Sequence, residues 1–233
     1  MIGPSIMLKD VGLTLNGNCI LAPINAELAA GNLHLLIGPN GAGKTSLLKT
    51  MLGLQPHRGE VIRCWPDKKN ATNKPAYIPQ QPLFDAVLPV TVADYLMASI
   101  SKRPLFFRQS STVFERVHAL LQQVGMDDKQ QLQLGELSGG ERQRLMFAQA
   151  LHWDSPLWFM DEPLSGLDGE GQEIIMALIN RLRAEGRTLV MVHHDMDYVR
   201  RYADNLLLID GGLKATGSAE QVLGRTNLTA EVA

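Results

Sequence analysis

Eight consecutive residues early in the chain combine glycines, a lysine and a threonine at a spacing that suits phosphate chemistry. They read GPNGAGKT at positions 38–45 and match the pattern G-x-x-x-x-G-K-[ST] in full. Glycines let successive backbone N–H groups turn toward anionic oxygens, while Lys44 is expected to reach the β- and γ-phosphates and Thr45 to bind Mg²⁺. We therefore expect a nucleoside triphosphate to bind at Gly38, Pro39, Asn40, Gly41, Ala42, Gly43, Lys44, Thr45 and Ser46.

Two adjacent carboxylates follow an apolar run later in the chain. The segment PLWFMDEP at positions 156–163 ends a strand-like run in Asp161 and Glu162. Adjacent side chains at a strand end diverge, so the two carboxylates can serve separate tasks. Beside a phosphate loop, we expect Asp161 to hold the magnesium shell and Glu162 to polarise a water for attack on the γ-phosphorus. Without that loop, the pair would indicate only a solvated loop start.

A second glycine-rich segment, LSGGERQR at positions 137–144, has the pattern of a helix start. Ser138 and Glu141 are spaced as a capping box, in which each side chain satisfies a backbone N–H group of the other residue. Most such tetrads do only this. A helix that begins here would also present free N–H groups and the positive end of its dipole to an anion.

Apolar runs of strand length indicate the elements that position these motifs. They are too short for amphipathic helices and typical of buried parallel strands, and they lie at 33–37, 76–78, 157–160, 189–192 and 206–209. Helical patterns separate them, one at 44–52 and one that ends before Gly186. Strands that alternate with helices predict an α/β fold, a phosphate-loop NTPase core with a mostly parallel sheet.

Two regions depart from this alternation. Residues 2–31 have the pattern of short strands with turns at Asn16-Gly17 and Ala30-Gly31, which predicts an N-terminal antiparallel β subdomain. The interval 91–135 contains helical stripes and predicts an inserted helical subdomain, preceded by a polar loop at 67–74. We expect a single ATPase domain over 1–233, made of the parts 1–90, 91–140 and 141–233.

Composition narrows the class of partner. The 233 residues carry a formal net charge of −2, and the absence of a dense basic run argues against nucleic acid as a partner. No apolar run approaches the ~20 residues that span a bilayer, and the N-terminus lacks the pattern of a signal peptide. Two cysteines, Cys19 and Cys64, fit a reducing cytosol.

The order of the motifs resembles that of the nucleotide-binding subunits of ATP-binding-cassette (ABC) transporters. GPNGAGKT, YIPQQ, LSGGERQR, LWFMDEP, SGLD and VMVHHD follow one another over nearly the whole chain. The resemblance implies that Gln80 contacts the metal and the attacking water, although the adjacent Gln81 is an alternative. It also implies that His194 contacts the γ-phosphate and that His193 packs or faces solvent.

The resemblance further implies that the chain works as a homodimer with ATP and Mg²⁺. Residues that act on the ATP of the opposite subunit would be Ser138, Gly139, Gly140, Glu141 and Asp168, while the metal ligands would be Thr45, Gln80 and Asp161. By itself, Asp168 would be interpreted as a helix N-cap. The chain would lie at the inner face of the cell membrane, bound to separate permease subunits and, in an importer, served by a substrate-binding protein.

Two positions depart from the family pattern. Leu15 stands where an aromatic residue commonly stacks on adenine, and Leu164 replaces the threonine usual after Asp-Glu-Pro. Base–aromatic stacking is worth ~1–3 kcal/mol, so nucleotide choice is expected to be loose.

The segment YIPQQPLFDAVLPVTVADYL most resembles the zinc and manganese importer ATPases. Siderophore, haem or cobalamin uptake, or an export system, are the alternatives within the family. An ATPase acting on DNA or the ribosome, and a nucleotide sensor without turnover, are the alternatives outside transport.

Overall fold

The computed structural model describes residues 2–66, 74–81, 89–101, 104 and 109–225, and the chain divides into two compact units. Unit 1 comprises Met1–Tyr77, Pro156–Pro163 and Leu182–Ala233; unit 2 comprises Ile78–Ser155 and Leu164–Arg181. The predicted loop at 67–74, except Lys74, lies outside the described residues, and so does the C-terminal tail from 226.

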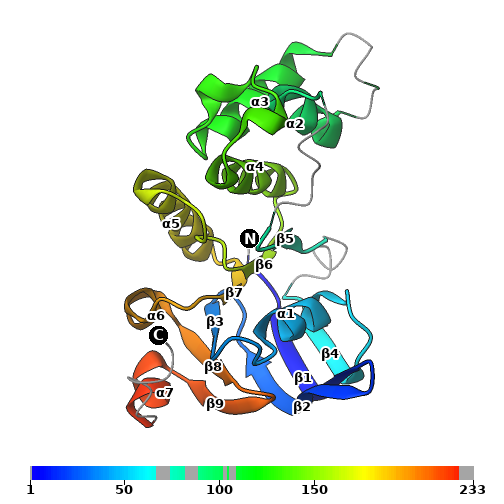
Figure 1. Ribbon diagram of the computed structural model, residues 1–233, viewed down its shortest axis with the longest axis vertical. Coiled ribbons are helices and arrows are strands. Elements are labelled where there is room, and N and C mark those ends of the chain that lie inside the picture. The colour runs from blue at the N-terminus through cyan, green and yellow to red at the C-terminus, as the bar shows by residue number, and fades with distance from the viewer. Residues whose placement is uncertain (1, 67–73, 82–88, 102–103, 105–108, 226–233) are drawn as a thin grey trace. The chain divides into compact units, whose positions relative to one another are not determined.

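Unit 1 contains an antiparallel sheet in the strand order β2-β1-β4 (Figure 1). Its strands are β1 (Ser5–Leu15), β2 (Asn18–Leu28) and β4 (Arg58–Cys64). Asn16 and Gly17 have φ angles of 50° and 81°, which suits the tight turn of a β-hairpin. The first two strands are each 11 residues long rather than short, because register shifts at bulges let one strand bend without ending.

The main sheet has the strand order β5-β6-β7-β3-β8-β9. Its centre is parallel, as predicted, because β3 pairs in parallel with β7 and β8, and β6 pairs in parallel with β7. Every residue of β3, β6 and β7 is buried, which explains their mostly apolar sequences, although each strand also buries one polar residue, His34, Asp161 or Thr188. The bounds are β3 (Leu33–Ile37), β5 (Ala76–Ile78), β6 (Leu157–Asp161), β7 (Thr188–Val192), β8 (Asn205–Ile209) and the antiparallel edge strand β9 (Leu213–Gly217).

Helix α1 (Lys44–Leu52) joins the two sheets of unit 1 through one hydrophobic core. Its buried Leu47, Leu48 and Met51 pack among apolar side chains of β1, β2, β3, β6, β7 and β8. Helices α6 (Met196–Tyr202) and α7 (Ala219–Arg225) follow β7 and β9. The helix that carries the phosphate loop is therefore fixed against both sheets.

Unit 2 is helical, as expected for the insert. It contains α2 (Val92–Ile100), α3 (Ser111–Gln122), the 3₁₀ turns η2 (Asp127–Lys129) and η3 (Leu134–Glu136), α4 (Gly139–His152) and most of α5 (Gly169–Ala184). Helix α2 starts after its N-cap Thr91, whose side chain accepts a hydrogen bond from the Asp94 backbone N–H group. In the described part of the chain, no helix combines the length and the apolar character that a membrane crossing requires.

Candidate nucleotide-binding site

The phosphate loop joins the end of β3 to the start of α1 and needs glycine at two positions. A Cβ on Gly38, whose φ is 141°, would lie 1.9 Å from the carbonyl oxygen of Ile209. A Cβ on Gly43, whose φ is 95°, would lie 2.6 Å from a methyl carbon of Leu21. Gly43 is also the N-cap of α1 and offers no side chain to its first N–H groups. A curled loop beneath an uncapped helix start is suited to bind phosphate.

Lys44 lies folded against this loop. Its side chain belongs to a residue only 7% exposed, and Nζ donates hydrogen bonds of 2.8 Å to the carbonyl oxygens of Gly38 and Pro39. Burial lowers the pKa of the amine, while the charges of Glu162 and Asp161 oppose that shift. The ammonium group is thus held inside the loop, close to where a triphosphate would bind.

Thr45 and Asp161 form a direct pair at the end of β6. The Thr45 hydroxyl donates a hydrogen bond of 2.9 Å to Oδ1 of Asp161, which is 2% exposed. Burial raises the pKa of Asp161, against the lowering effect of the Thr45 hydrogen bond. A hydroxyl and a carboxylate are hard oxygen ligands, the type that Mg²⁺ prefers. These two residues therefore fit a magnesium ion beside the phosphates.

Glu162 adopts an unusual backbone conformation. Its φ is 48°, in the left-handed region that non-glycine residues rarely adopt, and its N–H donates to the carbonyl oxygen of Val192 at 3.2 Å. Such strain costs about 1–3 kcal/mol and often occurs at functional positions. This turn follows Asp161 immediately after the strand, and the separate tasks of the two carboxylates stay a prediction.

The two histidines after β7 have different surroundings. His193 is 5% exposed, and its ring lies edge-on to Tyr198 with 4.6 Å between ring centroids. Burial, with a smaller effect of His194, lowers the pKa of His193 to about 4. His194 is exposed, and the next residue, Asp195, caps α6 through its side chain. His193 is therefore a packing residue, and His194 is the histidine available to a ligand.

The signature segment LSGGERQR forms the start of α4 in unit 2. Ser138 is the N-cap, Oγ accepts the Glu141 N–H at 3.2 Å, and Glu141 Oε2 accepts the Ser138 N–H at 2.7 Å. The predicted capping box is confirmed. A Cβ on Gly140 would lie 3.0 Å from the carbonyl oxygen of Gly166, so the signature approaches the SGLD segment closely.

Asp168 ends that segment and caps α5. Its Oδ1 accepts the N–H of Gly171 at 2.8 Å, and its carbonyl accepts the N–H of Gln172 at 2.9 Å. The simple N-cap interpretation therefore applies, and Asp168 is exposed. Gln80, which is also exposed, directly follows Pro79 after β5.

The predicted site residues are divided between the two units. Unit 1 brings together the phosphate loop, Asp161 and Thr45, and also carries Glu162 and His194. Unit 2 carries Gln80, Asp168 and the signature residues Ser138, Gly139, Gly140 and Glu141. The roles that the resemblance gives to unit 2 residues toward a nucleotide stay predictions.

Tyr77 in β5 lies near the Thr45–Asp161 pair, and the sequence analysis did not single it out. Its hydroxyl is buried and has no hydrogen-bond partner among the described residues, and burial with the charge of Asp161 raises its pKa to about 12. Nothing in the local pattern distinguishes it from any other strand tyrosine. Only the pairing of strands β5 and β6 reveals its proximity to Asp161.

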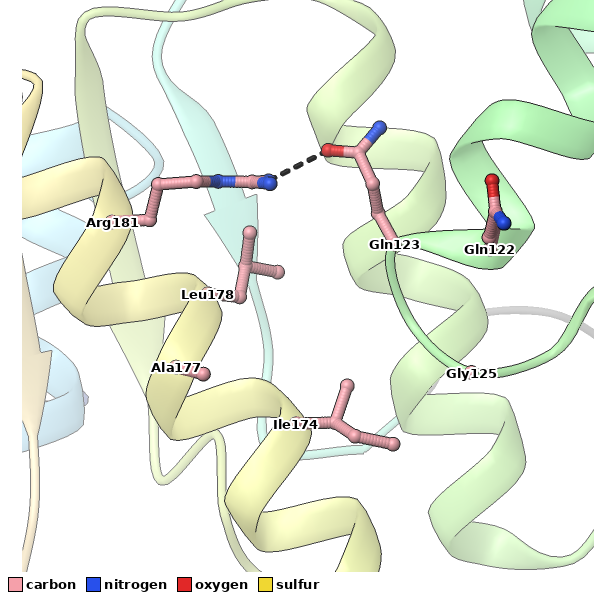
Figure 2. Close-up of a pocket in the computed structure, with 7 residues that line it drawn as sticks. All are labelled: Gln122, Gln123, Gly125, Ile174, Ala177, Leu178 and Arg181. Atoms are coloured by element: carbon pink, nitrogen blue, oxygen red, sulfur yellow. Dashed lines mark hydrogen bonds between the residues drawn. The ribbon is translucent and has the colours of Figure 1, made fainter.

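A separate pocket lies between the end of α3 and α5 within unit 2, as Figure 2 shows. Its volume is about 360 Å³, and Nη2 of Arg181 donates a 2.6 Å hydrogen bond to Oε1 of Gln123 at one side. The lining residues are Gln122, Gln123, Gly125, Ile174, Ala177, Leu178 and Arg181. None of the predicted site residues is among them, so this pocket is distinct from the phosphate loop.

Comparison with known proteins agrees with the motifs. A family profile described as ABC transporter matches residues 21–165. The manganese transport system ATP-binding protein MntB of Halalkalibacterium halodurans is 33% identical over 222 residues, 95% of this chain and 89% of that protein. The zinc transport system ATP-binding protein TroB of Treponema pallidum is 35% identical over 217 residues, 92% of this chain and 81% of that protein.

The fold also has solved counterparts. One, described as the structure of the ATP-binding subunit of an ABC transporter, superimposes with a TM-score of 0.78 at 24% identity, covering 97% of this chain and 94% of that one. At this identity the likeness concerns the fold, and it agrees with the α/β core, the antiparallel sheet and the helical insert described above.

Proposed function

Because the chain belongs to the ABC transporter family, we propose that it hydrolyses ATP to power import of a metal ion, manganese or zinc, through separate membrane subunits. The observation that carries ATP hydrolysis is the Thr45–Asp161 pair beside Lys44 at the uncapped start of α1. The names of the manganese and zinc relatives support the choice of ion.

Binding of the triphosphate uses the phosphate loop. On binding, Nζ of Lys44 exchanges its hydrogen bonds to the carbonyl oxygens of Gly38 and Pro39 for bonds to phosphate oxygens. The N–H groups of α1 and its dipole add further attraction for the anion. A Mg²⁺ ion would be held by Thr45 and Asp161, and when bound it neutralises charge on the phosphates. That Gln80 is a further metal ligand rests on the family resemblance alone.

Hydrolysis requires a group that orients and deprotonates the attacking water. We assign this role to Glu162, which follows the metal-binding carboxylate directly and is held in a strained turn. His194 is proposed to contact the γ-phosphate, since it is exposed at the end of β7 while its neighbour His193 is buried. Lys44 supplies positive charge to the phosphates from within the phosphate loop.

The active ATPase is proposed to be a homodimer. The start of α4 has a dipole and backbone N–H groups that suit a phosphate, and family resemblance assigns that phosphate to the ATP of the opposite subunit. Asp168, which caps α5 beside the signature, would lie at the same interface. Each nucleotide would then join two chains until it is cleaved.

The proposed partners are permease subunits, which would hold the ATPase at the inner face of the cell membrane, and a substrate-binding protein. Within this arrangement the ion is selected by those partners, since the described residues of this chain include no cluster of three or more His, Cys, Asp or Glu side chains that could hold a metal. The ATPase supplies the energy and the timing of transport.

Two variants test the ATPase. Glu162→Gln should bind ATP, hydrolyse it at least ~100-fold more slowly and accumulate as an ATP-bound dimer in analytical ultracentrifugation. Ser138→Arg should abolish hydrolysis while ATP binding by the monomer stays intact. Normal turnover by Glu162→Gln, or loss of monomer binding in Ser138→Arg, would contradict the assignments.

Transport is tested in cells that lack their own manganese and zinc importers. The chain is co-expressed with permease and binding-protein genes taken from its own genome, and uptake of radioactive manganese and zinc is measured. Uptake should depend on ATPase activity, so Lys44→Ala is the matched control. If neither ion enters above the control, the proposed cargo is wrong, while the ATPase assays still test the hydrolysis.

A further inference from the structure

We infer that Lys129 is a positioning residue for the signature helix: it holds the Glu141 carboxylate in its capping position and cancels the negative charge of Glu141 where a phosphate would approach. This inference rests on the proposed function, in which the start of α4 faces the nucleotide of a second chain. It assigns a role to a residue outside every sequence motif.

The contacts around Glu141 divide its two oxygens between two tasks. Oε2 accepts the backbone N–H of Ser138 at 2.7 Å, and Oε1 lies 2.9 Å from Nζ of Lys129. Lys129 comes from the turn η2, where its own N–H donates to the carbonyl oxygen of Met126 and its carbonyl accepts the N–H of Leu132, each at 3.1 Å. Backbone hydrogen bonds therefore fix Lys129 through both its N–H and its carbonyl group, and its side chain carries the ammonium group to Glu141.

The capping carboxylate creates an electrostatic conflict at this helix start. A negative side chain in the first turn stabilises the helix, but it also repels any phosphate that approaches the same N–H groups. Burial alone would raise the pKa of Glu141, yet hydrogen bonds from Lys129 and Ser138 outweigh it and lower the pKa to about 2. Glu141 is therefore ionised at neutral pH, and the ammonium group of Lys129 contacts this charge directly.

Lys129 balances this charge without contributing much to stability. The side chains of Lys129 and Glu141 are 29% and 17% exposed, and ion pairs as exposed as this add little to the stability of a fold. The pair has a direct effect on an approaching anion, because removing Lys129 leaves the negative charge of Glu141 at the helix start without its ion-pair partner. The lysine is thus expected to affect assembly more than folding.

The experiment measures ATP-dependent dimerisation in the Glu162→Gln background by analytical ultracentrifugation. Adding Lys129→Met should raise the dimer dissociation constant on the order of threefold to tenfold, the range expected for one partly screened charge. Adding Lys129→Arg should restore dimerisation to within about twofold of the parent. Lys214→Met, which removes an equal charge from an exposed position in β9, should have no effect.

Further readouts separate this role from a merely structural one. Monomer affinity for ATP should be unchanged in Lys129→Met, the melting temperature should fall by no more than about 2–4 °C because the Glu141 carboxylate loses a favourable partner, and the dimerisation defect should shrink as salt rises from about 0.1 to 0.5 M. The pKa of Glu141, measured by NMR, should rise when Lys129 is replaced by methionine.

The outcomes distinguish the inference from the proposed function. If the parent dimerises with ATP and Lys129→Met does so equally well, the inference is overturned and the proposed function stands. If the parent does not dimerise with ATP, the proposed assembly fails and the inference fails with it. An unchanged Glu141 pKa in Lys129→Met would overturn the contact itself, whatever the assembly.

Discussion

The negative charge of Asp161 destabilises the folded protein. A single substitution that removes this charge can show its effect on stability separately from its role in ATP hydrolysis. Burial raises the pKa of this carboxylate, despite the Thr45 hydrogen bond, and the charge of Glu162 adds to the shift. A raised pKa means that the folded protein favours the neutral group. Asparagine is neutral, has nearly the same shape and can still accept a hydrogen bond from the Thr45 hydroxyl. We therefore expect Asp161→Asn to raise the free energy of unfolding of the nucleotide-free protein at pH 7.

The size of the gain is a difference between opposing contributions. An ionised carboxylate at 2% exposure has lost hydration worth several kcal/mol. Its attraction to Lys49 and Lys44, together with the charged hydrogen bond from Thr45, returns about 1–3 kcal/mol. We expect a net gain of about 1 kcal/mol, a rise of about 2–4 °C in Tm for a chain of this length. ATP hydrolysis should fall roughly 100-fold or more, because the proposed magnesium ligand is lost.

The pH dependence follows from the direction of the shift. A carboxyl whose folded pKa is raised binds more protons in the folded state, so the wild type loses stability as pH rises from 3.8 through the raised pKa. Asparagine does not titrate. The stability gap between variant and wild type should therefore be full above the raised pKa and should close as the pH falls toward 3.8.

The assay is urea unfolding of both proteins between pH 3.5 and 8, without nucleotide, alongside ATPase rates. Asp197→Asn is the matched control, since this side chain is 94% exposed and its removal should change stability by less than about 0.5 kcal/mol. A loss of more than about 1 kcal/mol in Asp161→Asn, or a gap that is independent of pH, would refute the reasoning. Mg²⁺ with ATP should reverse the order, because the wild type gains more binding energy than the variant.

Three further predictions concern neighbouring groups. Gly38→Ala should unfold the protein or lower the free energy of unfolding, measured in urea, by several kcal/mol, since its Cβ would overlap a backbone carbonyl. Gly41→Ala, which faces open space at a φ of 79°, should lower it by only about 1 kcal/mol. Equal losses would contradict the steric argument. Tyr77→Phe should leave stability unchanged or raise it by up to about 1 kcal/mol by removing an unpaired buried hydroxyl, and a clear loss would reveal a bound water or ion at that hydroxyl. GTP should compete with ATP in equilibrium binding, because Leu15 at the end of β1 offers no aromatic ring; a preference for ATP above about 100-fold would exclude this.

The strands and the phosphate loop could be predicted because their signals are local. An uninterrupted apolar run such as residues 189–192 has no polar residue that could face solvent, so it must be buried on both faces. The helix start at Ser138 needs only the spacing to Glu141, and both hydrogen bonds of the capping box are present. Each of these signals lies within a few residues of the feature it predicts.

Other features depend on contacts between distant segments and left no local trace. The 11-residue lengths of β1 and β2 result from bulges in their pairing, which a strand pattern does not reveal. Lys129 lies in a turn with no motif, and its ion pair with Glu141 forms only because that turn folds back to the start of α4. Tyr77 approaches Asp161 only because β5 lies beside β6 in the sheet, although 79 positions separate the end of β5 from the start of β6 in the sequence.

Helix α1 begins without a cap of its own. Three other helices start at Thr91, Ser138 and Asp195, whose side chains accept hydrogen bonds from their first turns, whereas Gly43 has no side chain to offer. A bound triphosphate would supply those missing acceptors, so the substrate completes the secondary structure of its own site. Hydrogen exchange at the amides of residues 43–46 should therefore slow in proportion to occupancy, and these few amides would report nucleotide binding without any label on the nucleotide.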